Sequence, residues 1–321
     1  MSTLTTRLLG ASCAGALLIG CLAGCGSASA SSDLITLAQA RAVAQTWLHA
    51  SDATQVSEER GSLQRIDEAM ALVRTGPAPT PDPQVGEDTI WVAHQSRYPI
   101  SFLCFDKPAA SAGRAMAVEG QLFRFSKASA SAPWTVTHQG VLLSLGSRPS
   151  LALDSSGYAQ IVSPQDYGKF KVSPAQVGRD WGAYLQAANG SDAREFAPGP
   201  LTTQAIQDDK QQNDAGVAKH YNYSYAYAPT DDPVDAYLLR DGGALVLLGL
   251  QVTTHIVAQA APIQVTQDGK GVSDPAPGWY HDVTYVALAL ALFTTPPKDS
   301  AVKVTGIGAY TGTVTATGTK A

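Results

Sequence analysis

The amino-acid sequence predicts an α+β protein of two similar domains, each with two N-terminal helices packed on a curved antiparallel sheet. Two segments with helix-start patterns stand 137 positions apart (173 − 36), at Thr36 and Ser173. Each is followed by a second short helical pattern and then by apolar segments that alternate as strands do. The chain is 45% hydrophobic and 15% charged, a balance that supports a packed core and argues against general disorder.

Residues 1–25 predict an export signal. A polar start with Arg7 as its single positive charge precedes an apolar run over residues 8–23. That run is shorter than the about 20 apolar residues that a membrane-spanning helix needs. It ends in Leu22-Ala23-Gly24-Cys25, and residues 26–33, rich in serine and alanine, follow as a flexible tether.

This ending resembles the lipobox of bacterial lipoproteins, in which the cysteine carries a diacylglyceryl group. The resemblance implies that Cys25 is lipidated and that the mature protein is held at the outer, extracytoplasmic face of the cell membrane. Two acyl chains give a firm anchor, whereas one chain binds only marginally. Cys21, after Leu18-Ile19-Gly20, fits the same pattern and is the alternative site. An ordinary secretory signal that ends near Ala30 would instead release the protein.

Charge and cysteine content exclude several kinds of partner and site. The net charge is −5 and Lys and Arg do not cluster, so the sequence carries no electrostatic signal for nucleic acid or anionic lipid. With Cys25 lipidated, Cys104 is the only other cysteine of the mature chain, so no intramolecular disulfide is available. The apolar neighbours of Cys104 predict a buried, unreactive thiol.

The first domain is expected over residues 34–165. Thr36 and Gln39 form a capping-box pattern, and apolar residues at helical spacing continue the helix to about residue 50. A second short helix fits residues 63–74, and the proline-rich residues 75–83 end it. Strand-like segments follow at 89–94, 98–105, 121–127 and 134–143, and residues 151–158 have the pattern of a strand that enters a turn.

The second domain is expected over residues 172–321, with the boundary near residues 161–172, where the apolar pattern is interrupted. Ser173 and Gln176 repeat the capping-box pattern, with Pro174 at the first helical position. A second helix fits residues 201–213. Strands are expected at 220–228, 236–239, 244–254, 261–266, 280–293 and 301–311, with hairpin turns at 241–243 and 268–269.

Four short motifs carry a resemblance to a known family. They are Tyr98-Pro99, Pro149-Ser-Leu-Ala-Leu-Asp154 with Gly157-Tyr158-Ala159, Asp241-Gly-Gly-Ala-Leu-Val246, and Pro296-Pro297-Lys298. Through these motifs the chain resembles an uncharacterised family of actinobacterial lipoproteins. The order of helices and strands in each half resembles the cystatin-like and nuclear-transport-factor-like α+β folds, in which a bent sheet wraps the helices. The lipoprotein family has no established activity, so the resemblance implies a location and a fold but no function.

No catalytic or metal-binding motif stands out. The histidines are scattered without the spacing of metal ligands. Ser300-Ala-Val-Lys303 matches the Ser-x-x-Lys pattern of some nucleophilic enzymes, but it lies in a strand-like segment that does not bring the lysine to the serine. We therefore expect no catalytic residue, no cofactor and no metal site.

The one unusual motif is Tyr221-Asn-Tyr-Ser-Tyr-Ala-Tyr227. Alternation along a strand places Tyr221, Tyr223, Tyr225 and Tyr227 on one face. Such a row is a candidate binding face for a sugar or a protein partner. Alternatively, the row packs beneath the helices of the second half. The three carboxylates of the nearby loop, residues 230–235, are expected to lie in a solvated turn.

These observations predict a non-enzymatic binding or protein-interaction module of the cell envelope, attached to the membrane by its N-terminal lipid and suited to an envelope protein partner. The alternative is a carrier of a small apolar molecule or lipid in a cavity beneath a curved sheet. A hydrolase whose carboxylate site has no recognisable motif is the third possibility. No nucleic-acid partner is expected.

Overall fold

The structure, a computed structural model, describes residues 34–73, 90–107, 118–143, 148–187, 195–265 and 277–321. The lipobox, the tether, the proline-rich segment and the turn predicted at 268–269 lie outside these residues. All described helices and strands belong to one unit, Asp33–Ala321, which therefore carries its own core. Within the described residues, no helix combines the length and the apolar character needed to cross a membrane.

The chain begins with three helices: α1 (Leu37–Leu48), α2 (Asp52–Glu58) and α3 (Gly61–Val73). The predicted capping box of α1 is confirmed, because the Thr36 side chain accepts from the backbone of Gln39 at 3.3 Å and the Gln39 side chain accepts from the backbone of Thr36 at 2.8 Å. α2 was not predicted. It begins after Ser51, whose hydroxyl caps the backbone of Thr54.

Strands β1 (Ile90–Val92), β2 (Ile100–Asp106), β3 (Val118–Lys127) and β4 (Thr135–Leu143) form the predicted antiparallel meander. One face of the meander packs against α1 and α3. Phe102, Cys104 and Phe125 lie in this core with at most 1% of their surface exposed. β2 is buried along its whole length, so both of its faces pack inside the fold.

The second half also begins with helices. A 3-10 helix η2 (Pro164–Lys169) leads into α4 (Pro174–Gln186), and a π-helical turn η3 (Pro200–Gln204) leads into α5 (Ala205–Val217). Pro174 occupies the first helical position as predicted, but Ser173 makes no side-chain capping bond, so the second capping box is wrong. The sequence pattern therefore correctly predicted where α4 begins. It was wrong about the hydrogen bonds that cap the first turn of this helix.

The strands of the second half are β5 (Tyr221–Pro229), β6 (Asp235–Leu238), β7 (Ala244–Ala258), β8 (Ile263–Val265), β9 (Gly278–Thr295) and β10 (Thr305–Lys320). β6 and β7 are joined by the predicted turn at 241–243, where Gly242 adopts a φ of 82° that favours glycine. β10 begins later than predicted and continues almost to the C-terminus.

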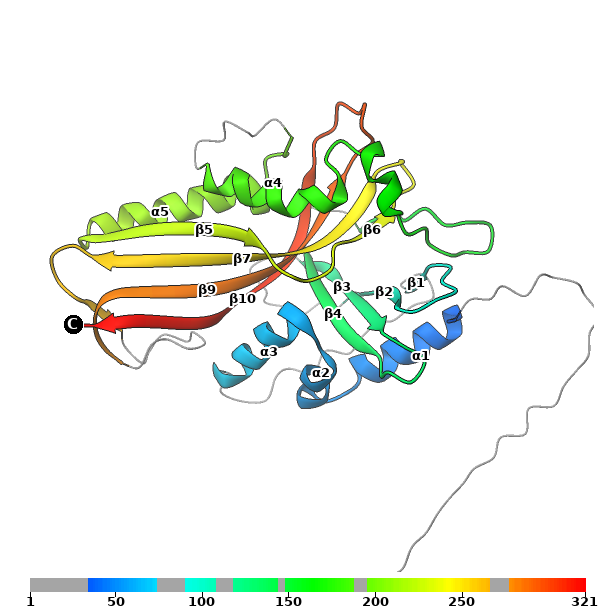
Figure 1. Ribbon diagram of the computed structural model, residues 1–321, viewed down its shortest axis with the longest axis horizontal. Coiled ribbons are helices and arrows are strands. Elements are labelled where there is room, and N and C mark those ends of the chain that lie inside the picture. The colour runs from blue at the N-terminus through cyan, green and yellow to red at the C-terminus, as the bar shows by residue number, and fades with distance from the viewer. Residues whose placement is uncertain (1–33, 74–89, 108–117, 144–147, 188–194, 266–276) are drawn as a thin grey trace, which may run out of the picture. The chain divides into compact units, whose positions relative to one another are not determined.

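The strands of both halves join in one ten-stranded sheet in the order β1-β2-β3-β4-β10-β9-β7-β5, with β6 on β7 and β8 on β9. The last strand of the first half, β4, pairs with the last strand of the second, β10, at Gly308↔Leu142 and Ala309↔Val141. Helices α4 and α5 lie next to β5 and β7, and helices α1–α3 lie next to the part of the sheet that contains β4 (Figure 1). The α+β class is therefore confirmed, whereas two similar domains are not shown.

A shared core joins the two halves. Leu103 and Leu122 of the first half cluster with Tyr237, Leu245 and Leu292 of the second. The expected boundary, residues 161–172, is also tied to the second half, through isolated bridges from Ile161 to Tyr237 on β6 and from Phe170 to Pro297 after β9. An exposed strand edge invites unwanted pairing, and joining β4 to β10 covers one edge of each half.

Candidate functional site

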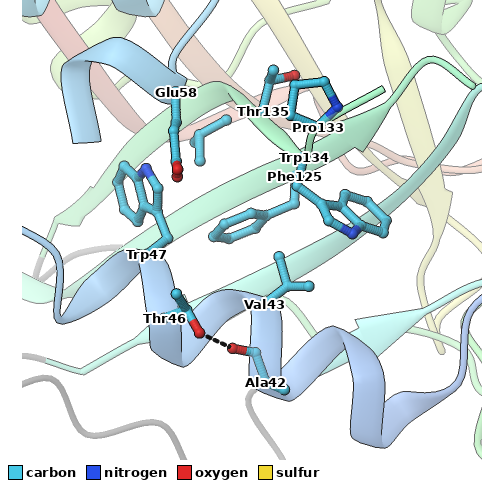
Figure 2. Close-up of a pocket in the computed structure, with 10 residues that line it drawn as sticks. Ala42, Val43, Thr46, Trp47, Glu58, Phe125, Pro133, Trp134 and Thr135 are labelled. Carbon is cyan, nitrogen blue, oxygen red and sulfur yellow. Dashed lines mark hydrogen bonds between the residues drawn. The ribbon is translucent and has the colours of Figure 1, made fainter. Parts of the chain in front are cut away.

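A cavity of about 350 Å³ lies between α1, the end of α2 and the β3–β4 hairpin. We call it the α1–β4 cavity. Its lining is drawn in Figure 2 and consists of Ala42, Val43, Thr46, Trp47, Glu58, Phe125, Pro133, Trp134, Thr135 and Val136. Several of these residues, including Thr46, Glu58 and Pro133, are exposed, so the cavity opens to the surface.

The walls of the cavity are aromatic side chains that pack against one another. Trp47 comes from the buried face of α1, and its ring meets Phe125 edge-on with centroids 5.7 Å apart. Phe125 stacks on Phe102 with ring centroids 4.7 Å apart, and Trp134 meets Phe102 edge-on with centroids 5.2 Å apart. Phe125 is paired with Val136 across β3 and β4, which places both side chains on the face that α1 covers.

The polar groups of the cavity are few. The hydroxyl of Thr46 donates to the carbonyl of Ala42 at 2.8 Å, and that of Thr135 donates to the carbonyl of Ser126 at 3.3 Å. The indole nitrogen of Trp47 is buried and has no hydrogen-bond partner among the described residues. A buried donor of this kind normally finds an acceptor. In Figure 2 this nitrogen lies on the Glu58 side of the cavity.

Glu58 is placed by the junction between α2 and α3. Glu59 forms a bridge with Val136, and the backbone nitrogen of Arg60 donates to the carbonyl of Val136 at 3.0 Å. These contacts fix the end of α2 on β4, so the exposed Glu58 carboxylate stands at the mouth of the cavity. Sequence reasoning missed this position because it missed α2. Ser51 followed by Asp52 was the available helix-start signal.

Two carboxyl groups converge behind the cavity. Burial, and secondarily the neighbouring Asp67 carboxylate, raises the pKa of Glu59 to about 9. The hydroxyl of Tyr310 donates to Asp67 at 2.5 Å. Paired carboxyls can perform acid–base chemistry, but Glu59 is only 1% exposed and does not line the cavity. The raised pKa of Glu59 means that the pair retains a proton inside the protein.

The carboxylates of the loop at residues 230–235 do not all lie in a solvated turn, so that prediction is wrong. Asp232 accepts from the backbone nitrogen of Ser62 at 3.1 Å, and Asp235 lies 2.5 Å from the guanidinium of Arg124. Both contacts tie the loop to the first half of the chain. No local signal could have revealed them, because Asp235 and Arg124 are 111 positions apart (235 − 124).

The tyrosine row alternates as predicted, with half-buried tyrosines and exposed residues between them. The row lies beneath α5. The Tyr225 hydroxyl donates to the Asp209 carbonyl at 3.3 Å and to Gln212 at 3.1 Å, and the Tyr227 hydroxyl donates to the Asp209 carboxylate. This is the packing alternative that the sequence left open. α5 covers part of the row, and the tyrosines remain half-buried.

The remaining candidates from the sequence are Cys104 and the possible metal ligands. Cys104 is buried as predicted, and burial raises the pKa of its thiol to about 12, which disfavours the nucleophilic thiolate form. Burial lowers the pKa of His138 to about 3, which keeps its imidazole neutral. In the described ranges, no three His, Cys, Asp or Glu residues are arranged to hold a metal ion. Cys21 and Cys25 lie outside those ranges.

A family model described as "Domain of unknown function (DUF8094)" matches residues 91–318. The chain belongs to this family. No curated protein and no solved structure matches it. The matched region begins at Trp91, so it supplies Phe125 and Trp134 to the α1–β4 cavity, whereas Trp47 and Glu58 come from the helices that precede it.

Proposed function

We propose that the protein is a non-enzymatic binding protein that holds a small, largely apolar molecule in the α1–β4 cavity. Its volume of about 350 Å³ falls in the usual range for small-molecule sites, roughly 300–1,000 Å³. Such sites are mostly apolar and contain a few polar groups that orient the ligand. The observation that carries the proposal is the combination of Trp47, Phe125 and Trp134 around one open cavity.

Two of the polar groups at the cavity, those of Trp47 and Glu58, suggest the chemistry of the ligand. An apolar body would cover the half-buried side chains of Trp134 and Val43, and removing this surface from water favours binding by about 25 cal/mol per Å². A hydrogen-bond acceptor on the ligand would satisfy the buried indole N–H of Trp47. A donor on the same side of the ligand would reach the Glu58 carboxylate at the mouth of the cavity.

In this proposal the protein acts at the outer face of the membrane, attached through the lipid that the lipobox predicts at Cys25. A protein-interaction role through the tyrosine row has less support, because α5 covers the row. A hydrolytic role also has less support, because the converging carboxyls of Glu59 and Asp67 lie away from the cavity.

The proposal predicts saturable binding of N-phenyl-1-naphthylamine, a neutral apolar probe that fluoresces when it leaves water. Residues 33–321 are titrated with the probe. Trp134→Ala should weaken binding about tenfold or more, as expected when a central aromatic contact is truncated. Trp279→Ala is the matched control, because Trp279 is 53% exposed on β9 and does not line the cavity. Equal affinity in the wild type and Trp134→Ala would refute the proposal.

A further inference from the structure

The threonine hydroxyls of the α1–β4 cavity present hydrogen-bond acceptors to a ligand. A threonine hydroxyl has one hydrogen to donate and two lone pairs that accept. In Thr46 that hydrogen is donated to the carbonyl of Ala42 (Figure 2). In Thr135 it is donated to the carbonyl of Ser126. Both threonines line the cavity, so a bound molecule meets their lone pairs and has to donate hydrogen bonds to match them.

The carboxylate of Glu58 adds a negative charge to these acceptors. Glu58 is the last residue of α2, is exposed, and lines the cavity. The guanidinium of the neighbouring Arg60 is directed to the end of α2, where it donates to the carbonyl of Ser57 at 2.8 Å and to that of Glu59. An ionised carboxylate accepts hydrogen bonds and donates none, and it binds a charged donor more strongly than a neutral one. A protonated amine therefore matches this side of the cavity.

The opposite side of the cavity is formed by Trp134, whose ring lies close to a cation. Figure 2 shows Trp134 across the cavity from Glu58 and Trp47. The Nζ atom of Lys127 lies 5.9 Å from the centre of the Trp134 ring. Lys127 would repel a second cation at this ring, whereas an apolar group would meet no such repulsion. These charges orient a ligand with its ammonium group toward Glu58 and its apolar body toward Trp134.

We propose that the α1–β4 cavity binds a protonated amine with an apolar body. The ammonium group would donate to the Glu58 carboxylate, and the apolar body would contact Val43 and Trp134. An oxygen acceptor close to the ammonium group would also satisfy the buried indole N–H of Trp47, which lies on the Glu58 side. This inference rests on the proposed function, because it assigns a charge to the ligand of the same cavity.

The test compares three ligands that share a phenylbutyl body: phenylbutylamine, phenylbutanol and phenylpentanoate. Calorimetric titration of residues 33–321 at neutral pH measures the affinity of each ligand. We expect the amine to bind about fivefold or more tightly than the alcohol, and the carboxylate to bind most weakly. An alcohol or a carboxylate that binds as tightly as the amine would overturn the inference.

Glu58→Gln tests which group causes the preference for the amine. This change removes the charge and nearly preserves the size of the side chain, so the ratio of amine to alcohol affinity should fall to about one. The control is Glu68→Gln, which removes the same charge from an exposed position of α3 that does not line the cavity. Its ratio should equal that of the wild type. An unchanged ratio in Glu58→Gln would contradict the assignment of Glu58.

Salt provides a second measurement that needs no variant. The interaction between an exposed carboxylate and an ammonium group is screened at about 1 M sodium chloride. The ratio of amine to alcohol affinity of the wild type should therefore fall on addition of salt. A ratio that does not change with salt would show that the preference does not come from charge, and the inference would be wrong.

Failure of this inference is distinguishable from failure of the proposed function. If N-phenyl-1-naphthylamine binds and Trp134→Ala weakens its binding, but the three phenylbutyl ligands bind equally, the cavity binds neutral molecules and only the charge assigned to the ligand is wrong. If neither the naphthylamine nor any of the three ligands binds, the proposed function is wrong and this inference is wrong with it.

Discussion

At the scale of single residues, the buried carboxyl of Glu59 makes the strongest prediction. Its pKa rises from 4.5 to about 9 on folding, mainly because the charged form loses its hydration. Between these values the folded protein keeps a proton that the unfolded chain has released. The stabilising contribution of Glu59 is therefore fully present below pH 4.5 and is lost as the pH rises through about 9.

We predict that the free energy of unfolding of the wild type falls with increasing pH in this window, by up to about 1 kcal/mol per pH unit. Glu59→Gln keeps the shape of the side chain and removes its titration, so its stability should depend less on pH. Urea unfolding near pH 5 and near pH 8.5 measures the difference. Glu58→Gln, an exposed neighbour, is the control and should retain the wild-type dependence. Identical pH profiles for the wild type and Glu59→Gln would contradict the prediction.

At the scale of elements, α5 and β5 fit together through a glycine. A Cβ added to Gly216 on α5 would collide with the ring of Tyr223 on β5. The tyrosine rings stack along β5. The ring centroid of Tyr225 is 6.4 Å from that of Tyr223 and 6.5 Å from that of Tyr227. The close approach of Gly216 is what allows α5 to cover this row.

We predict that Gly216→Ala lowers the free energy of unfolding by about 1–3 kcal/mol, because overpacking outweighs the better helix propensity of alanine. Amide hydrogen exchange in α5 should increase as well. Gly168→Ala is the matched control, since a Cβ there meets nothing within 4 Å. A Gly216→Ala variant as stable as the wild type would show that α5 does not press on the tyrosine row.

The sequence was informative where the determining signals are local. It correctly predicted the capping box at Thr36, the glycine turn at 241–243 and the alternation of Tyr221 to Tyr227. It missed α2, whose short length leaves little periodicity to detect. It described the tyrosine row correctly but could not choose between an exposed face and packing beneath a helix, since burial depends on where α5 lies.

The candidate site was less predictable than the fold. Trp47 lies on the buried face of α1, within the segment whose apolar residues follow helical spacing, but nothing local indicates that Trp134 and Glu58 meet it at one cavity. These residues come from three elements that only the tertiary fold brings together. The pairing of β4 with β10 also depends on the tertiary fold, so the sequence did not reveal it. It consists of two residue pairs, Gly308↔Leu142 and Ala309↔Val141.

At the scale of the whole folded unit, an ion pair helps to join the two halves. Arg124 on β3 and Asp235 on β6 have side chains only 10% and 22% exposed. Arg124 also donates to the hydroxyl of Thr137 at 2.7 Å. Removing one partner of a buried pair leaves the other charge without compensation, which costs several kcal/mol.

We predict that Asp235→Asn lowers the free energy of unfolding by about 3 kcal/mol and that unfolding remains a single transition, because both halves share one core. The control is Asp214→Asn, which removes the exposed pair between Lys210 and Asp214 on α5. Exposed pairs contribute little, so this change should stay within about 0.5 kcal/mol. Separate transitions for the two halves, or equal effects of the two variants, would argue against the joint core.

The most direct test of the proposed binding function is fluorine NMR of the protein labelled with 5-fluorotryptophan. The five tryptophans report on different places: Trp47 and Trp134 in the α1–β4 cavity, Trp91 in the core shared by the two halves, Trp181 in the core beneath α4, and Trp279 at the surface. Addition of N-phenyl-1-naphthylamine should shift the resonances of Trp47 and Trp134 and leave those of Trp181 and Trp279 in place. Unchanged Trp47 and Trp134 signals at saturating probe would contradict the proposed binding function.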